Sequence, residues 1–279
     1  MVRLDIILSL LIGVVNMRLI VSCLLMLLVL PIQAKIVEQD IDYSDGGTTL
    51  KGYIVYDDSF KGERPAVLVV HEWWGLNDYA RKRARQLARL GYMAMAVDMY
   101  GDGRQAKHPD DAGKFAKEIS SNIELSRKRF MAAISVLANN KRVTAGKIAA
   151  IGYCFGGGVV LQMAREGVDL RGVASFHGSL ATTRPAQPGV VKAKILVAHG
   201  GIDPFVKKTD LTNFWDEMNQ AGADYQINIY SGASHSFTNP GADEFGKQFN
   251  LPLAYNQRAD EESWQDLQLF LQDVLAQHN

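Results

Sequence analysis

The sequence predicts an α/β fold, with a mostly parallel central sheet and helices on both faces. Three observations support this prediction. Apolar strand-like runs alternate with helix-like stretches from about residue 50 onward, which is typical of repeated βα units. The composition, 47% hydrophobic and 22% charged, is that of a globular protein. No part of residues 35–279 is rich enough in Pro, Gly or Ser to act as a linker, so we expect a single domain there.

The first 34 residues differ from the rest of the chain. From Met17 they show a positive start, the apolar core "LIVSCLLMLLVL" and a small residue, Ala34, before Lys35. This is the build of a secretory signal peptide, so residues 1–34 are interpreted as a leader and Met17 as a candidate true start. We therefore expect an exported protein, periplasmic or secreted, that contacts no membrane once its leader is cleaved.

Two alternatives stay open for this leader. An uncleaved anchor would use residues 6–32 and would leave the protein attached to the membrane. The segment Ile20–Cys23 loosely matches a lipoprotein cleavage box, although seven further apolar residues follow Cys23. Cleavage before Lys35 would leave Cys154 as the only cysteine, so no internal disulfide is expected.

The first half of the domain supplies three strands and three helices. Residues 50–57 alternate as a strand, 64–72 form the continuous apolar run of a buried parallel strand, and 92–101 form another strand. The helix at 76–91 has Asn77 as a candidate N-cap and Gly91 as its stop. Two more helical patterns cover residues 110–122 and 123–140.

The second half continues the alternation to the end of the chain. Strand patterns occupy residues 147–154, 172–178 and 194–203, and residues 225–237 form a strand followed by a loop. Helical patterns occupy residues 155–167, 207–222 and 260–277. In open parallel sheets the functional site lies at the carboxyl ends of the strands. The polar residues Glu72, Cys154, Asp203 and His235 all fall where strand patterns end.

Cys154 lies in "GYCFG", which has the form of the G-x-S-x-G nucleophile elbow with sulfur in place of oxygen. Gly152 and Gly156 provide the small neighbours that a strained strand-to-helix turn needs. The elbow would place the thiol at a helix N-terminus, where unpaired N–H groups stabilise a thiolate. The N–H of Phe155 would then face a developing oxyanion. The alternative is a buried structural cysteine in a glycine-rich turn.

His235 and Asp203 are the candidate partners of Cys154. His235 stands in "SGASHSF" after a strand, and Asp203 ends the apolar strand "ILVAHGGID". Taken alone, a histidine is more often structural, and Asp203 fits an Asx-turn before Pro204. The order nucleophile, acid, histidine is that of the α/β-hydrolase arrangement, so we expect Cys154, Asp203 and His235 to form a catalytic triad.

Glu72 follows a buried strand and precedes two tryptophans. A carboxylate beside apolar rings tends to have a raised pKa, and it could hold the thiol by a hydrogen bond. The alternative is a surface salt bridge with an arginine of "RKRAR" (81–85), which we expect to be a solvated helix face. The N–H of Trp73 is the candidate second oxyanion donor.

Charge and motifs exclude several function classes. Thirty basic residues balance 30 acidic ones, so nothing indicates nucleic-acid binding. No metal-binding spacing such as H-E-x-x-H or C-x-x-C is present, and "GYCFGGG" lacks the Lys-Ser/Thr of a phosphate loop. We therefore expect neither a metal nor a nucleotide cofactor.

The motifs "HEWWGLNDYAR", "AVDMYG", "IGYCFGGG", "HGGIDPFV" and "ASHSF" resemble those of the dienelactone hydrolase family. The resemblance covers about residues 40–277. It implies a compact α/β-hydrolase fold without a large lid, with Cys154 as nucleophile, His235 as base and Asp203 as its orienting acid. It also implies that Glu72 interacts with Cys154 and switches it between thiol and thiolate.

Two positions depart from the family pattern. Family members bind a substrate carboxylate through arginines near the "DMYG" loop and just after "HSF". Arg104 could serve as the first here, but Asn239 stands at the second position. We therefore treat Arg104 and Asn239 as candidate substrate contacts and expect a bulkier, more apolar pocket beside the tryptophans.

The expected function is hydrolysis of small carboxylic esters or lactones through an acyl-enzyme, by a monomer or a dimer. Two other classes stay open. One is a non-catalytic binding protein with a hydrolase fold. The other is an envelope thiol redox protein, which would need a partner because no resolving cysteine is available.

Overall fold

The computed structural model describes residues 35–276. The expected leader, its cleavage point and the candidate start at Met17 lie outside the described residues. Within the described range, no helix has the length and apolar character needed to cross a membrane.

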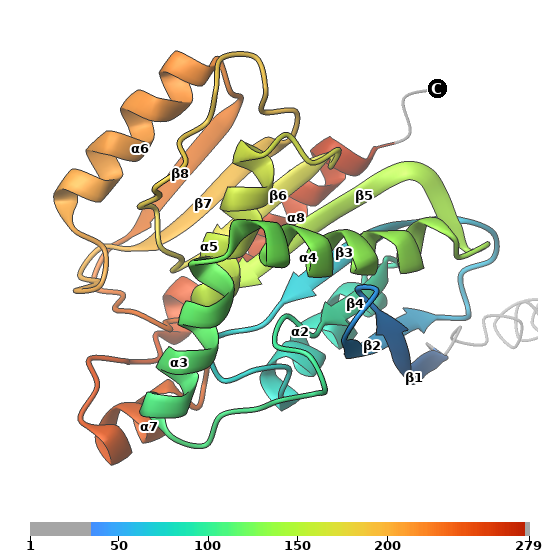
Figure 1. Cartoon of the computed structure of the whole chain (residues 1–279), viewed down its shortest axis with the longest axis horizontal. Helices are drawn as coiled ribbons and strands as arrows, with labels where there is room; N and C mark the ends of the chain where they lie inside the picture. Colours follow the sequence, from blue (N-terminus) through green and yellow to red (C-terminus); the bar gives the residue numbers. More distant parts are fainter. Residues whose placement is uncertain (1–34, 277–279) are drawn as a thin grey trace, which may run out of the picture. The chain divides into compact units, whose positions relative to one another are not determined.

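An eight-stranded sheet forms the centre of the molecule, and its order is β1-β2-β4-β3-β5-β6-β7-β8 (Figure 1). β1 pairs antiparallel with β2, β2 pairs antiparallel with β4, and the other five pairings are parallel. The strands are β1 (Ile36–Ser44), β2 (Thr49–Asp57), β3 (Arg64–Val70), β4 (Met93–Val97), β5 (Val143–Tyr153), β6 (Gly172–Phe176), β7 (Lys194–Gly200) and β8 (Tyr225–Tyr230). The prediction of a mostly parallel sheet is confirmed.

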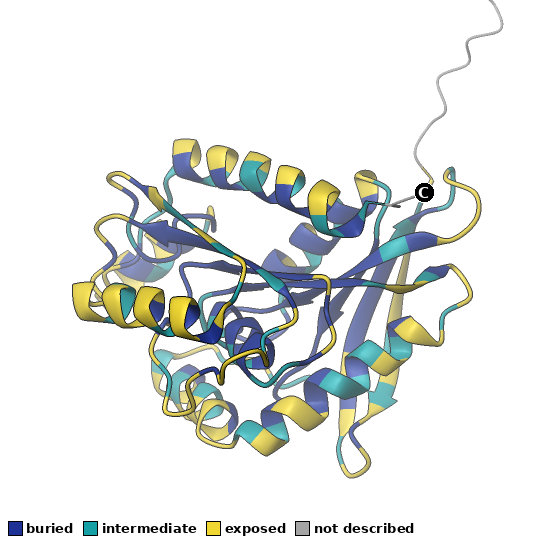
Figure 2. Cartoon of the chain, turned by 90° about the horizontal axis from the view of Figure 1, so that it is seen from above, coloured by how far each residue is buried: buried dark blue, intermediate teal, exposed yellow. Residues whose placement is uncertain are grey.

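Helices cover both faces of the sheet. The helices are α2 (Asp78–Arg89), α3 (Pro109–Ser120), α4 (Ile123–Ala138), α5 (Phe155–Arg165), α6 (Lys208–Ala221), α7 (Ala242–Phe249) and α8 (Gln257–Leu275). Apolar residues of α4, α5 and α6 join one core cluster, and those of α2 and α8 join the other. The helices α2, α4, α6 and α8 turn buried residues inward and exposed residues outward (Figure 2), whereas α5 has no exposed residue.

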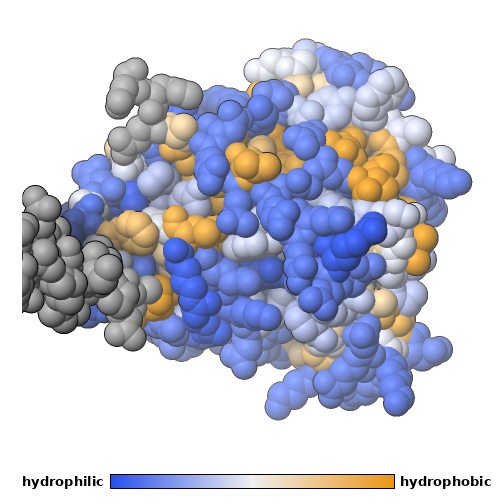
Figure 3. Space-filling view, turned by 180° about the vertical axis from the view of Figure 1, so that it is seen from behind, coloured by the Kyte–Doolittle hydropathy of each residue, from blue (hydrophilic) through white to orange (hydrophobic). Residues whose placement is uncertain are grey.

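The two core clusters follow from the period-2 alternation of the strands. Ala66, Leu68 and Val70 of β3 face one cluster, whereas Val67 and Val69 face the other. Because β3 is apolar at both sets of positions, it is buried on both faces, as a central parallel strand must be. The face seen from behind is largely hydrophilic, with several hydrophobic areas among the polar residues (Figure 3).

The sequence prediction missed two elements. β1 reads "IVEQDIDYS" and has no clean apolar alternation, because it is an edge strand with mostly exposed or half-buried side chains. α7 has only eight residues, too few to establish a helical period. It packs Phe245 and Phe249 against Trp74 of the loop after β3.

Candidate active site

Cys154 occupies a sharp turn between β5 and α5. Its backbone angles are φ 52° and ψ −115°, a region that residues other than glycine rarely adopt. Its N–H donates to Phe176 O at 3.0 Å and to His177 Nδ1 at 3.1 Å. Such a conformation costs about 1–3 kcal/mol and persists only where the surroundings impose it. The half-buried side chain is thus held at the first turn of α5.

The two glycines flanking this turn are required by close backbone contacts. A Cβ on Gly152 would lie 2.0 Å from Gly156 O, and a Cβ on Gly156 would lie 2.4 Å from Val70 O. Gly156 N also donates to His71 O at 3.1 Å. Glycine is therefore required at both positions of G-x-C-x-G because the backbones of β3, β5 and α5 lie too close together beneath the thiol to admit a Cβ.

The structure brings His235 and Asp203 together with Cys154. His235 Nδ1 lies 2.8 Å from Asp203 Oδ2, and His235 Nε2 lies 3.1 Å from Cys154 Sγ. Asp203 follows β7 and His235 follows β8, so the three side chains meet at the carboxyl ends of their strands. Asp203 Oδ1 also accepts from Phe205 N at 2.8 Å. The carboxylate of Asp203 therefore uses one oxygen for an Asx-turn and the other for the contact that orients His235.

Electrostatics at His235 favour its charged form. Burial lowers the pKa of His235, but the attraction of a Cys154 thiolate and the hydrogen bond to Asp203 outweigh burial and raise this pKa to about 10. An imidazolium between a thiolate and a carboxylate is stabilised from both sides. The arrangement thus favours a protonated His235 between the sulfur and the carboxylate near neutral pH.

Glu72 binds Ser236 and Asn239, and not Cys154 as expected. Its Oε2 accepts from Asn239 Nδ2 at 2.6 Å and its Oε1 accepts from Ser236 Oγ at 3.0 Å. Neither oxygen has a hydrogen bond to Cys154, whose Sγ is bonded to His235 instead. The alternative for Glu72, a surface salt bridge, is wrong because Glu72 is buried. Burial raises the pKa of Glu72, against the opposing effect of the Asn239 and Ser236 hydrogen bonds.

The expected oxyanion donors are the N–H groups of Trp73 and Phe155. Phe155 is the first residue of α5, where N–H groups have no partner within the helix. No hydrogen bond of residues 35–276 uses either N–H group. The backbone of Trp73 is held in place through its carbonyl oxygen, which accepts a hydrogen bond from Tyr100 Oη at 2.9 Å.

The two candidate substrate contacts are engaged elsewhere. The Arg104 guanidinium donates to Tyr100 O at 2.9 Å. It also donates to both carboxylate oxygens of Glu118, at 3.1 Å in each case. Asn239 is buried and its amide binds Glu72 and the N–H of Gly241. Asn239 is thus committed within the protein, which corrects its expected role, whereas Arg104 is partly exposed in a surface ion pair and its role as a substrate contact stays a prediction.

Sequence reasoning missed a buried chain of hydrogen bonds beneath the elbow. His177 has φ 41°, accepts from Cys154 N at Nδ1, and lies 2.8 Å from Thr238 Oγ1 through Nε2. Thr238 Oγ1 lies 2.6 Å from Tyr79 Oη. Burial lowers the pKa of His177 well below its ordinary 6.5, so the ring is neutral with its proton on Nε2. His177 directly follows β6, and this place at a strand end is the sequence signal that could have indicated it.

Arg83 adds to this buried set of hydrogen bonds. The prediction that "RKRAR" is a solvated helix face is therefore wrong for Arg83. Its guanidinium is 3% exposed, donates to Tyr79 Oη and Thr238 O, and forms an ion pair with Asp260 of α8. Arg81 and Arg85 of the same run are more exposed and pair with acidic residues of β1. In this run, Arg83 thus forms a buried ion pair, whereas Arg81 and Arg85 form ion pairs at the surface.

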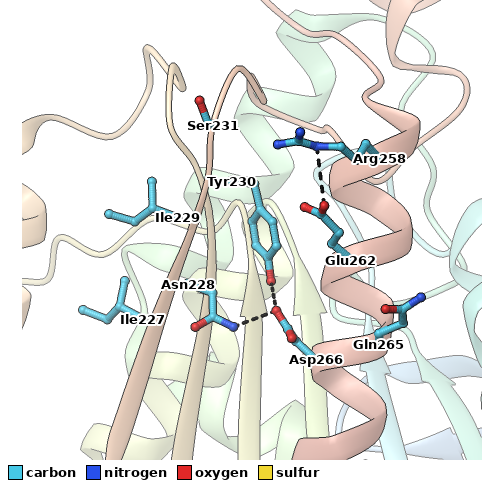
Figure 4. A pocket seen from close by; sticks show the side chains of 9 residues that line it. All are labelled: Ile227, Asn228, Ile229, Tyr230, Ser231, Arg258, Glu262, Gln265 and Asp266. Carbon is cyan, nitrogen blue, oxygen red and sulfur yellow. Dashed lines mark hydrogen bonds and ion pairs between the residues drawn. The ribbon is translucent and has the colours of Figure 1, made fainter.

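A separate groove of about 540 Å³ lies between β8 and α8 (Figure 4). Tyr230 Oη and Asn228 Nδ2 both donate to Asp266 Oδ2 across it, at 2.6 and 2.7 Å. Its lining contains none of the residues assembled around Cys154. Among residues 35–276, no group of His, Cys, Asp or Glu side chains forms a candidate metal site.

Comparison with known proteins gives consistent matches. The model of the dienelactone hydrolase family matches residues 50–275. A putative carboxymethylenebutenolidase of Saccharolobus solfataricus is 27% identical over 85% of this chain and 99% of its own length. Protein usf of Aquifex pyrophilus is 28% identical over 72% of this chain and 87% of its own length.

Two solved structures are similar along nearly their whole length. The structure named m3DLH superposes with a TM-score of 0.80 at 35% identity, covering 86% of this chain and 98% of that one. A dienelactone hydrolase-like promiscuous phosphotriesterase from metagenomic libraries gives a TM-score of 0.78 at 33% identity, with the same coverage.

Proposed function

Because this chain belongs to the dienelactone hydrolase family and is a carboxylic ester hydrolase, we propose that it cleaves small esters or lactones with Cys154, His235 and Asp203 as its catalytic triad. One observation supports this proposal above the others. The Asp203–His235–Cys154 line has contacts of 2.8 and 3.1 Å, and Cys154 stands on a turn with φ 52°. Nucleophile, base and orienting acid are within the reach that the chemistry needs.

In the first half of the reaction, Cys154 Sγ attacks the carbonyl carbon and the carbonyl electrons move to oxygen. The oxyanion accepts hydrogen bonds from the N–H groups of Phe155 and Trp73. Each such donor contributes about 10²–10³ in rate in enzymes of this type. The tetrahedral intermediate collapses to a thioester, and His235 gives its proton to the leaving alkoxide. With a lactone, the released hydroxyl stays attached to the acyl group.

In the second half, neutral His235 takes a proton from water and the resulting hydroxide attacks the thioester. Collapse expels the thiolate and releases the carboxylic acid, while His235 keeps the proton. Asp203 stabilises the imidazolium in both halves and fixes the tautomer that presents Nε2 to sulfur. Glu72 acts indirectly: it holds Ser236 and Asn239, which lie one and four residues after His235.

The experiment follows acylation of the purified protein with a p-nitrophenyl ester. We expect a burst of p-nitrophenol and, by intact mass and peptide mapping, an acyl adduct on Cys154 that forms and decays. Cys154→Ala should show neither, and in protein that begins at Lys35 no other cysteine is present to take up the acyl group. Turnover by Cys154→Ala would contradict the proposed mechanism.

The same experiment separates the competing functions. A binding protein would show no adduct, and its Cys154 would be alkylated only after unfolding. A thiol redox protein would be alkylated when folded but would release no p-nitrophenol.

We also propose that the protein is exported and acts as a monomer. The signal-peptide pattern of residues 17–34 supports export. N-terminal sequencing of the mature protein, expected to begin at Lys35, and sedimentation of that protein would test both statements.

A further inference from the structure

Phe205 places a half-exposed aromatic ring directly beside His235. The two ring centroids are 4.8 Å apart with a T-shaped arrangement, and 52% of Phe205 is exposed. Its backbone is fixed by the hydrogen bond from its N–H to Asp203 Oδ1. The ring is thus held against the imidazole by the same carboxylate that orients His235, while much of its surface faces solvent.

The chemistry of the proposed reaction decides which part of a substrate lies beside His235. The imidazolium gives its proton to the leaving alkoxide, so the alcohol half of the ester must lie within hydrogen-bond reach of Nε2. The acyl half is held on the other side of Sγ, by the oxyanion donors. A ring packed against the imidazole is therefore adjacent to the alcohol half.

The arginines described near the site are engaged by carboxylates of the protein, and the two lysines that follow Phe205, Lys207 and Lys208, are exposed at the N-terminus of α6. Arg104 is paired with Glu118, and Arg83 is buried and paired with Asp260. Asn239 carries no charge and is bonded to Glu72. The other side chains described around Cys154 are carboxylic acids, imidazoles, aromatic rings or hydroxyls. The half-buried ring of Phe155 stacks with His71 and contacts Tyr100, which extends the apolar surface near the thiol.

Building on the proposed function, we infer that Phe205 is a specificity-determining residue that packs against the leaving alcohol and selects esters of uncharged, ring-sized apolar alcohols. Burying an aromatic group against such a ring removes apolar surface from water. Contacts of this size discriminate substrates by about tenfold or more.

The test compares esters that share an acyl group and differ only in the alcohol: benzyl acetate, ethyl acetate and 4-carboxybenzyl acetate. Acid release is followed by pH-stat. We expect the wild type to prefer benzyl acetate over both others by about tenfold in kcat/KM. Phe205→Ala should lower kcat/KM for benzyl acetate by about tenfold, mainly through KM, and should change ethyl acetate by less than about twofold. Phe205→Leu should keep part of the preference because it keeps apolar bulk.

Trp215→Ala is the matched control, since Trp215 is an equally exposed aromatic residue, at 55%, on α6. It should leave all three rates unchanged. If Phe205→Ala lowers all three rates equally, its effect runs through Asp203 and the inference is wrong. A wild-type preference for the carboxylated ester would also overturn it. Equal rates with a normal Cys154 thioester would overturn this inference alone, whereas the absence of any thioester would overturn the proposed function with it.

Discussion

Backbone packs closely against Gly156 beneath the thiol, so Gly156 and Gly158 of α5 respond oppositely to the same substitution. In Gly156→Ala, the new Cβ would lie 2.4 Å from Val70 O and 2.6 Å from His71 O. Both oxygens belong to backbone, so β3 or α5 must move by more than about half an ångström. In Gly158→Ala, two residues along α5, the nearest atom is Ser179 O at 3.6 Å, an ordinary contact.

The magnitudes follow from these contacts. Overpacking costs about 1–3 kcal/mol, and loss of the Gly156 N–H bond to His71 O adds about 1 kcal/mol. Alanine has a higher helix propensity than glycine, which stabilises the folded state by about 0.5–1 kcal/mol and offsets part of this cost. We therefore expect Gly156→Ala to destabilise the fold by about 2–3 kcal/mol. Gly158→Ala keeps only the favourable effect and should stabilise it by about 0.5–1 kcal/mol.

Thermal unfolding monitored by circular dichroism measures both variants. For a domain of this size about 1 kcal/mol corresponds to about 2–4 °C in Tm. Gly156→Ala should thus melt about 4–12 °C below the wild type and should react slowly with the p-nitrophenyl ester, because the elbow shifts. Gly158→Ala should melt slightly above the wild type. Equal Tm values for the two variants would refute the reasoning from backbone contact.

Two further predictions concern buried groups. The folded pKa of Glu72 lies above its ordinary 4.5, so the stability that depends on its protonated form is present below pH 4.5 and is lost as pH rises toward the folded pKa. The stability of Glu72→Gln relative to the wild type, measured by denaturant unfolding, should therefore increase from pH 5 to pH 8; a pH-independent difference would contradict this. His177→Phe removes the acceptor for Cys154 N–H and the donor to Thr238, and should slow the acylation burst by about tenfold, equivalent to about 1.4 kcal/mol. His177→Asn retains an acceptor near Nδ1 and should recover part of that rate, whereas a full burst in the phenylalanine variant would show that His177 does not position the elbow.

The sequence predicted the elements whose apolar pattern is complete and missed those that depend on their neighbours. β3 was recognisable because it is buried on both faces, and α2 because Asn77 caps it and Gly91 follows its end. β1 is formed by pairing with β2 along an exposed edge, so its side chains carry little signal. α7 depends on the stacking of Phe245 and Phe249 on Trp74, which no local pattern reveals.

The same distinction applies to the site. Cys154, Asp203 and His235 were found because each ends a strand and their order is informative. The partners of Glu72 were not predicted, because Ser236 and Asn239 reach it from more than 160 positions along the chain. Arg83 looked like one more charge on a basic helix. Its burial follows from contacts with Thr238 and Asp260, which depend on how α8 and the His235 loop pack over α2.

The elbow has a consequence for when the thiol becomes reactive. Its geometry needs Val70 and His71 from the end of β3, Gly156 from α5 and Phe176 from the end of β6, and the β3 residues lie roughly 85 to 105 positions before the other two. Pairings of such long sequence separation form late in folding. An incompletely folded chain would therefore carry an ordinary cysteine, and nucleophilic power would arise only with the assembled sheet. If the protein is exported unfolded, its hydrolytic activity stays latent until it reaches the compartment where it folds.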